Sequence, residues 1–390
     1  MSQQIAYVII TPYSLYKSRT GGILSRVITR TGLDLAGLRM FAPSAELAKE
    51  YADNIISAND PQDRKIQELL QRYVLENFSP DPKTGRRRRV MMLLLKGEDA
   101  VRKVRSVVGH LGPNRRMGET IRDTYSDVVF DADGHIHYFE PAVLASPTEE
   151  EAQTKLKIWA RYSDADGGIL ENVIAYAPGD KPERTLVLIK PDNFRFATGR
   201  PGNVIDFFSR TGLYIVGAKV LHMSTAQALE FYGPVREFLR TKLKDSVGAK
   251  AREVLEKELA IKIPAAVEKT LGEILGPLQG DAQFDSIVRF MAGHAPGEMP
   301  QADWDKPGSE KCIALVYEGV RAVSKIRDVL GPTDPSKAPP GSIRREFGST
   351  IMVNAAHASD SAANAQREFG IVKPGENNFK QVIEEMLGTV

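Results

Sequence analysis

A histidine near the end of the 390-residue chain stands among residues that could pass a phosphate group between molecules. His357 lies just before Ser359, Asp360 and Ser361, residue types that favour the start of a helix, expected over 362–369. A helix start presents unpaired backbone N–H groups, which attract an anionic phosphate. A neutral imidazole is a competent nucleophile near pH 7, so the pattern predicts phosphoryl transfer through a phosphohistidine.

The chain also offers partners for such a nucleophile. Glu368 follows His357 by eleven residues and could hold the second ring nitrogen, which would fix the tautomer. Phosphoryl transfer is catalysed chiefly by positioning and by positive charge against the transferring group. The candidates for that charge are Lys190, Arg327 and Arg344.

The second half of the chain resembles the nucleoside diphosphate kinases from about Glu183 to Pro374. The sequence around the histidine, Asn-Ala-Ala-His-Ala-Ser-Asp-Ser over 354–361, follows the family pattern, and Lys190–Pro191 stands where the family has its Lys-Pro. The spacings from Arg344 to His357 and from His357 to Glu368 also agree. The resemblance therefore rests on several separate segments.

The resemblance implies a role for each matching residue. The expected catalytic residues are His357, Lys190, Glu368 and Ser359. Those expected to hold the phosphates, the sugar hydroxyl or a position near the phosphates are Lys190, Tyr232, Arg327, Thr333, Arg344 and Asn354. Ungapped counting puts Gln283 where the family has an aromatic residue against the base, a departure from the pattern, so the base clamp is assigned to Phe284 and Ile287.

The implied reaction transfers the γ-phosphoryl of a nucleoside triphosphate, usually ATP, to a nucleoside diphosphate by a ping-pong route. Mg²⁺ would be held mainly through the nucleotide phosphates rather than by protein ligands. The family further implies a ferredoxin-like α+β fold and a homo-oligomer. The alternative from a different class is a non-catalytic nucleotide-binding or scaffolding protein of the same fold.

The chain contains an internal repeat, which predicts a duplicated fold. IAYVIITP, ending at Pro12, recurs as RTLVLIKP, ending at Pro191, and RTGL at 30–33 recurs at 210–213. Each copy shows strands alternating with amphipathic helices, the βαββαβ order of a small antiparallel sheet with helices on one face. We expect one copy over 1–175 and the catalytic copy over 183–390.

The second copy is longer because it carries an insertion at about 235–280. The offset between the copies grows from 180 residues at RTGL to 222 at the glycines 109 and 331. Apolar residues recur every three or four positions there, with Pro264 and Gly276–Pro277 as breaks, which predicts two helices. These helices could form a lid, an oligomer contact or a membrane-surface helix. Because they carry charged residues of both signs, we favour packing within the chain or between subunits.

The first copy lacks the chemistry of the second. Thr11 replaces Lys190, whereas Arg105 and Arg122 match the two arginines. Ungapped counting puts His135 at the histidine position, but its surroundings, DADGHIHYFE, indicate a β-hairpin. Alignment on the helix start puts Leu144 there instead, with Ser146 as a capping residue, and we prefer it. We therefore expect an inactive first copy, whose binding of phosphate stays open.

Composition excludes several classes of protein. The chain is 42% hydrophobic and 26% charged, with 52 basic against 50 acidic residues, so a general attraction to nucleic acid or acidic membrane is not expected. A basic run at 86–89 is interpreted as a solvated loop. One cysteine, Cys312, excludes internal disulfides and thiolate-rich metal sites, and with no apolar span or signal sequence we expect a cytoplasmic protein.

Overall fold

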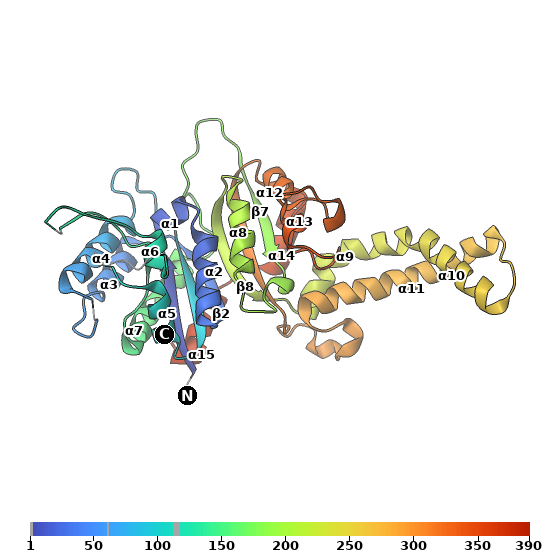
Figure 1. Ribbon diagram of the computed structural model, residues 1–390, viewed down its shortest axis with the longest axis horizontal. Coiled ribbons are helices and arrows are strands. Elements are labelled where there is room, and N and C mark those ends of the chain that lie inside the picture. Colours follow the sequence, from blue (N-terminus) through green and yellow to red (C-terminus); the bar gives the residue numbers. More distant parts are fainter. Residues whose placement is uncertain (1–2, 61, 112–117, 134) are drawn as a thin grey trace. The chain divides into compact units, whose positions relative to one another are not determined.

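The computed structural model describes residues 3–60, 62–111, 118–133 and 135–390 (Figure 1). It consists of two compact units. The larger unit comprises the chain up to Val220 together with Ile313–Phe369 and Lys373–Val390, and the smaller comprises Leu221–Cys312 with Gly370–Val372. Both repeats therefore contribute their sheets mainly to the larger unit, and the insertion at about 235–280 lies in the smaller one.

The first repeat forms a four-stranded antiparallel sheet in the order β2-β3-β1-β6. The strands are β1 (Gln3–Ile10), β2 (Asp34–Phe41), β3 (Val90–Glu98) and β6 (Val143–Leu144). The helices are α1 (Pro12–Tyr16), α2 (Thr20–Thr31), α3 (Ala45–Asp53), α4 (Arg64–Asn77), α5 (Ala100–Val108), α6 (Ile121–Tyr125) and α7 (Glu149–Asp166). A hairpin of β4 (Asp127–Phe130) and β5 (Ile136–Glu140) lies outside this sheet.

The second repeat has the same topology, in the order β10-β7-β9-β8. Its strands are β7 (Pro182–Ile189), β8 (Tyr214–His222), β9 (Lys311–Val320) and β10 (Ala356–Ala358). The helices of this repeat that lie wholly or mainly in the larger unit are α8 (Arg200–Ser209), α12 (Ala322–Leu330), α13 (Ile343–Phe347), α14 (Ala362–Val372) and α15 (Asn378–Leu387). Both sheets follow the strand order fourth-first-third-second, so the predicted duplicated ferredoxin-like α+β fold is confirmed.

Helices cover both faces of the first sheet, not one face as the repeat pattern predicted. Every residue of Ile5–Ile10 is buried, although successive side chains of a strand point to opposite faces. Helices α5 and α7 both pack on β1. The strand is continuously apolar because both of its faces are covered. The sequence pattern predicts a buried strand but does not indicate which helices bury it.

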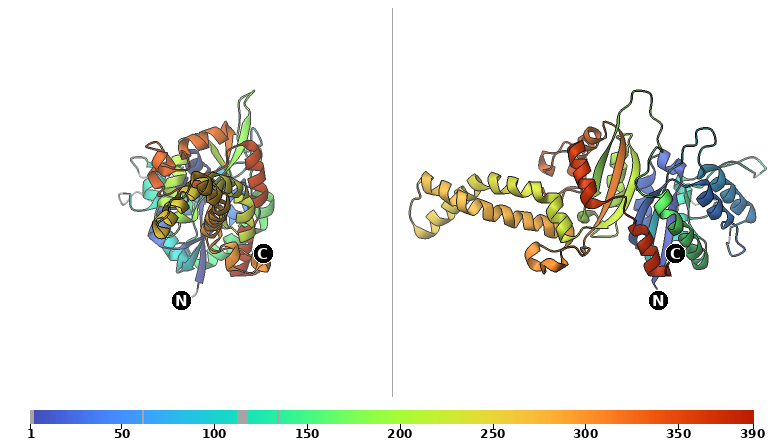
Figure 2. Two further views of the ribbon diagram at one scale, coloured as in Figure 1. Left: turned by 90° about the vertical axis from the view of Figure 1, so that its right-hand side faces the viewer. Right: turned by 180° about the vertical axis from the view of Figure 1, so that it is seen from behind.

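The smaller unit contains α9 (Thr225–Lys242), α10 (Lys244–Leu259) and α11 (Ala265–Ala292), seen in yellow and orange in Figure 2. Pro264 lies at the start of α11, as predicted. The predicted break at Gly276–Pro277 is wrong, because both residues lie inside α11. A Cβ on Gly276 would lie 2.8 Å from the Cα of Lys244, so this glycine allows α10 and α11 to approach closely. That packing outweighs the local cost of the proline.

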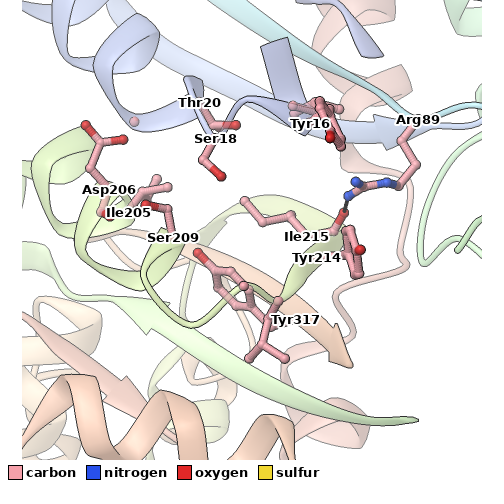
Figure 3. A pocket seen from close by; sticks show the side chains of 14 residues that line it. Tyr16, Ser18, Thr20, Arg89, Ile205, Asp206, Ser209, Tyr214, Ile215 and Tyr317 are labelled. Atoms are coloured by element: carbon pink, nitrogen blue, oxygen red, sulfur yellow. Dashed lines mark hydrogen bonds between the residues drawn. The ribbon is translucent and has the colours of Figure 1, made fainter. Parts of the chain in front are cut away.

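Within the larger unit, the two repeats pack together through α2 and α8. A Cβ on Gly202 would lie only 2.1 Å from the carbonyl oxygen of Gly21, so the helices cross where both have glycine. Beside this crossing lies a cavity of about 180 Å³, around which Figure 3 shows Asp206, Ser209 and Tyr317. Burial raises the pKa of the Asp206 carboxyl to about 6, although the backbone N–H groups of Gly21 and Gly22 favour its ionised form.

The C-terminal helix of the second repeat packs on the first repeat. Helix α15 contacts α7 and β2, and the ring of Phe379 meets that of Phe41 edge-on at 5.4 Å between centroids. The guanidinium of Arg39, on β2, donates to the carbonyl of Glu376 at 3.1 Å. The core of the first repeat is thus completed by the last residues of the chain. No helix in the described part of the chain is long and apolar enough to cross a membrane.

Candidate active site

His357 lies on the short edge strand β10, where it pairs with Leu188 of β7. The residue two positions before it, Ala355, has φ of +71°, a conformation that costs energy for a residue with a Cβ. Three hydrogen bonds hold it: its carbonyl accepts from the backbone N–H of Lys190 at 3.0 Å and from Nδ2 of Asn193 at 2.7 Å, and its N–H donates to Asp192 at 3.3 Å. The turn that starts the histidine strand is therefore fixed by residues that directly follow β7.

One carboxylate orients the histidine. Nε2 of His357 lies 2.9 Å from Oε1 of Glu368, and Oγ of Ser359 donates to Oε2 of the same group at 2.5 Å. Glu368 is buried, while 24% of the histidine side chain is exposed. An ionised carboxylate only accepts hydrogen bonds, so it favours the tautomer with the proton on Nε2 and the lone pair on Nδ1.

Helix α14 brings Glu368 to this position. Ser361 caps it, since its hydroxyl accepts from the N–H of Asn364, as the predicted helix start requires. Asp360, just before the cap, accepts from Nδ2 of Asn364, which lowers the pKa of its carboxyl; the charge of Arg327 adds to this effect. The spacing of eleven residues from His357 to Glu368 thus becomes a direct contact.

The predicted lysine and asparagine contact each other. Nζ of Lys190 donates to Oδ1 of Asn354 at 2.9 Å and to the carbonyl of Met352 at 2.5 Å, and both side chains are buried. Nδ2 of Asn354 donates to the carbonyl of Thr333 at 3.1 Å. A buried ammonium needs such partners, and they hold it at a fixed place in the site.

Two arginines add positive charge on the α12 and α13 side. Arg344 donates from Nη1 to the carbonyl of Gly331 at 2.9 Å and from Nη2 to the carbonyl of Ala356 at 3.3 Å, directly before the histidine. Arg327, on α12, is exposed, and so is Thr333. The larger unit therefore brings together His357, Ser359, Glu368, Lys190, Asn354, Arg344 and the Thr333 backbone.

Three predicted site residues belong to the smaller unit, which is described by itself. Tyr232 lies on α9, where its ring packs against Phe231 at 4.9 Å between centroids. Phe284 and Ile287 lie on α11. Phe284 is buried in that unit, with the guanidinium of Arg236 over its ring at 5.6 Å. Their assignment to the nucleotide stays a prediction.

The sequence did not single out Asp192, Asn193 and Arg200 as site residues. Arg200, on α8, donates to Oδ2 of Asp192 at 2.7 Å and to Oδ1 of Asn193 at 3.0 Å. Both acceptors in turn hold the strained residue Ala355. The signal available in the sequence was their position directly after Lys190–Pro191, but the backbone conformation they support has no sequence signature.

The equivalent place in the first repeat holds a leucine, as predicted. Leu144 of β6 pairs with Ile9 of β1, the register in which His357 pairs with Leu188 in the second repeat. His135 instead precedes β5 in the β4–β5 hairpin, where its N–H donates to Asp131. Eleven residues after Leu144, in the place of the glutamate, stands the buried Lys155. The first repeat therefore lacks both the imidazole and its carboxylate partner at this position.

Several known proteins are similar to this chain in sequence. A family model described as "Nucleoside diphosphate kinase" matches residues 4–164, 183–248 and 254–377. A nucleoside diphosphate kinase of Staphylothermus marinus is 30% identical over 190 residues, covering 49% of this chain and 92% of that protein. One of Wolinella succinogenes is 32% identical over 193 residues, covering 50% and 96%. A solved NDP kinase from Pyrobaculum aerophilum covers 49% of this chain and 95% of its own, at 28% identity and a TM-score of 0.31.

Proposed function

Because the chain belongs to the nucleoside diphosphate kinase family, we propose that its second repeat transfers the γ-phosphoryl of a nucleoside triphosphate to a nucleoside diphosphate through phospho-His357. The observation that carries the proposal is the 2.9 Å contact between Nε2 of His357 and Glu368. This contact directs the lone pair to Nδ1. An imidazole oriented in this way beside several cations is suited to accept a phosphoryl group.

The reaction consists of two equivalent displacements. In the first, the Nδ1 lone pair of His357 attacks the γ-phosphorus, the N–P bond forms, and the bond to the β–γ bridging oxygen breaks, so the diphosphate leaves with that electron pair. The proton on Nε2 stays there, hydrogen-bonded to Glu368, and the carboxylate of Glu368 balances the positive charge that the ring gains. In the second, a diphosphate oxygen attacks the same phosphorus and the ring nitrogen leaves, which restores the neutral imidazole.

The surrounding side chains supply the charge that the transferring phosphoryl needs. Lys190, directly after β7, and Arg344, on α13, lie close to the histidine strand, and Arg327 and Thr333 are exposed for contact with a nucleotide. Their role is to hold the phosphate oxygens in line and to stabilise the developing charge, the main source of catalysis in phosphoryl transfer.

The residues around His357 would hold magnesium only by way of the phosphate oxygens of a bound nucleotide. Within the described ranges, the one group of three or more acidic, histidine or cysteine residues close enough to hold a metal is exposed Asp131, Asp133 and His135, in the first repeat. Mg²⁺ commonly binds phosphate oxygens and water with few protein ligands. When bound, it would neutralise phosphate charge, while the residues around His357 position and stabilise the phosphoryl group.

Labelling with γ-³²P-ATP tests the proposal. The wild-type protein should acquire acid-labile, alkali-stable label on His357, and added GDP should remove it as labelled GTP. His357→Asn should acquire none. His135→Asn is the matched control, since it removes an exposed histidine from the first repeat, and it should label like the wild type. A wild-type protein that binds ATP but takes no label would instead be a non-catalytic nucleotide-binding protein.

A further inference from the structure

The first repeat keeps the arginine arrangement of the active site. Arg122 donates from Nη1 to the carbonyl of Gly109 at 2.9 Å and from Nη2 to the carbonyl of Val143 at 3.2 Å. Arg344 makes the same two bonds, to Gly331 at 2.9 Å and to Ala356 at 3.3 Å. The two guanidinium groups are therefore held in equivalent ways, although Leu144 has replaced the histidine.

The two arginines of the first repeat are occupied by their own chain. Nη2 of Arg105 forms a salt bridge of 3.0 Å with Oδ1 of Asp60, and the two side chains are 10% and 6% exposed. Nη1 of Arg122 donates to Oε1 of Gln62 at 3.2 Å. In the second repeat, Arg327 stands in the place of Arg105 and is exposed.

Side-chain bonds fix the segment that carries these acceptors. Gln67, on α4, donates from Nε2 to the carbonyl of Gln62 at 3.0 Å and accepts from the N–H of Ser57 at 2.8 Å. The buried Gln67 thus links Ser57 and Gln62 to α4. The N–H of Gln62 in turn donates to Oδ1 of Asp60 at 3.0 Å, so the fold holds both acceptors.

The physical need for an anion here is strong. Arg122 is only 2% exposed, and burial, followed by the like charge of Arg105, lowers the pKa of its guanidinium to about 9. Two neighbouring buried cations are costly unless an anion lies beside them. A phosphate could supply that negative charge, and here a carboxylate does.

We propose that Asp60 is a built-in ligand that takes the place of a phosphate in the first repeat, so that this repeat binds no nucleotide. The arginine pair is then a latent site for phosphoanhydrides, closed by the chain's own carboxylate. The first repeat has lost not only its nucleophile but also access to its phosphate-binding groups. The pair Arg327 and Arg344 should therefore bind a phosphoanhydride, whereas the pair Arg105 and Arg122 should bind none.

Calorimetric titration of the full chain with inorganic pyrophosphate tests this inference. Asp60→Ala removes the carboxylate and should bind one more pyrophosphate per chain than the wild type. Asp53→Ala, which removes an exposed carboxylate paired with Lys49, is the matched control and should show the wild-type number. Pyrophosphate should also raise the Tm of Asp60→Ala by several degrees more than that of the wild type, because it restores the missing anion.

Two results would overturn the proposal. One is that Arg105→Ala binds one pyrophosphate fewer than the wild type, because the site in the first repeat would then be open in the wild type. The other is Asp60→Ala that folds, by circular dichroism, but gains neither a site nor extra stabilisation. If Asp60→Ala does not fold, Asp60→Asn keeps the shape and should show the same larger Tm shift; an unchanged shift would reject the idea. Labelling of His357 is measured separately and does not affect these differences.

Discussion

Replacing Glu368 by alanine should slow phosphorylation of His357 without weakening nucleotide binding. The carboxylate contacts Nε2 of His357 at 2.9 Å and Oγ of Ser359 at 2.5 Å. A hydrogen bond to a charged group contributes about 1.5–3 kcal/mol, and the one to the ring strengthens as the ring becomes positive. Since about 1.4 kcal/mol corresponds to tenfold in rate, we expect a fall of roughly ten- to a hundredfold.

Single-turnover kinetics with γ-labelled ATP separate this effect from binding. The maximal rate of labelling in Glu368→Ala should fall, while the ATP concentration at half-maximal rate stays unchanged, because Glu368 contacts His357 and Ser359. Glu368→Gln keeps an acceptor oxygen but no charge and should be intermediate. Glu385→Ala removes an exposed carboxylate of α15 and serves as the control.

The reasoning about the tautomer would be refuted by a folded Glu368→Ala protein that labels within twofold of the wild type. A change confined to the half-saturating ATP concentration would also refute it, since the glutamate would then act on binding. A lower urea midpoint alone would not, because the loss leaves the Ser359 hydroxyl without its acceptor, at a cost of about 1–3 kcal/mol in the free energy of unfolding.

Two further predictions concern the packing of the repeats. Burial raises the pKa of Asp206 from 3.8 to about 6, so its contribution to stability is fully present below pH 3.8 and is lost as the pH rises through 6 and the buried carboxyl ionises. Asp206→Asn should therefore raise the free energy of unfolding by about 1 kcal/mol at pH 8, after discounting for partial exposure, but not at pH 4; equal effects at both pH values would contradict this. Phe379→Ala removes a fully buried ring and should lower the stability of the first repeat by about 3–5 kcal/mol, measured by urea unfolding with the fluorescence of Trp159; an unchanged midpoint would show that α15 is not part of that core.

The local features of the site could be predicted from the sequence because each depends on neighbouring residues. The run Ser359–Ser361 marks a helix start, and an eleven-residue spacing then brings Glu368 back to His357. Alignment on the expected helix start favoured Leu144 over His135, and the strand register agrees with that choice, although Thr148 and not Ser146 caps the helix. The repeat itself predicted the duplicated fold.

The break expected at Gly276–Pro277 shows where local reasoning failed. Proline and glycine are poor helix formers on their own, yet the helix continues through them because the glycine permits close packing of α10 on α11. Propensity is worth about 1–3 kcal/mol at such positions, and tertiary packing can exceed it.

By itself, the sequence determined the repeat, the family pattern around His357 and the loss of the nucleophile from the first copy. Only the tertiary structure decided that Asp192 helps to hold Ala355 in a strained turn and that Asp60 forms an ion pair with Arg105. It also decided that α15 completes the core of the first repeat. The physical reason is sequence separation: periodicity and caps are encoded over a few residues, whereas these contacts join segments 45 to more than 300 residues apart, and their energy depends on burial that no short pattern records.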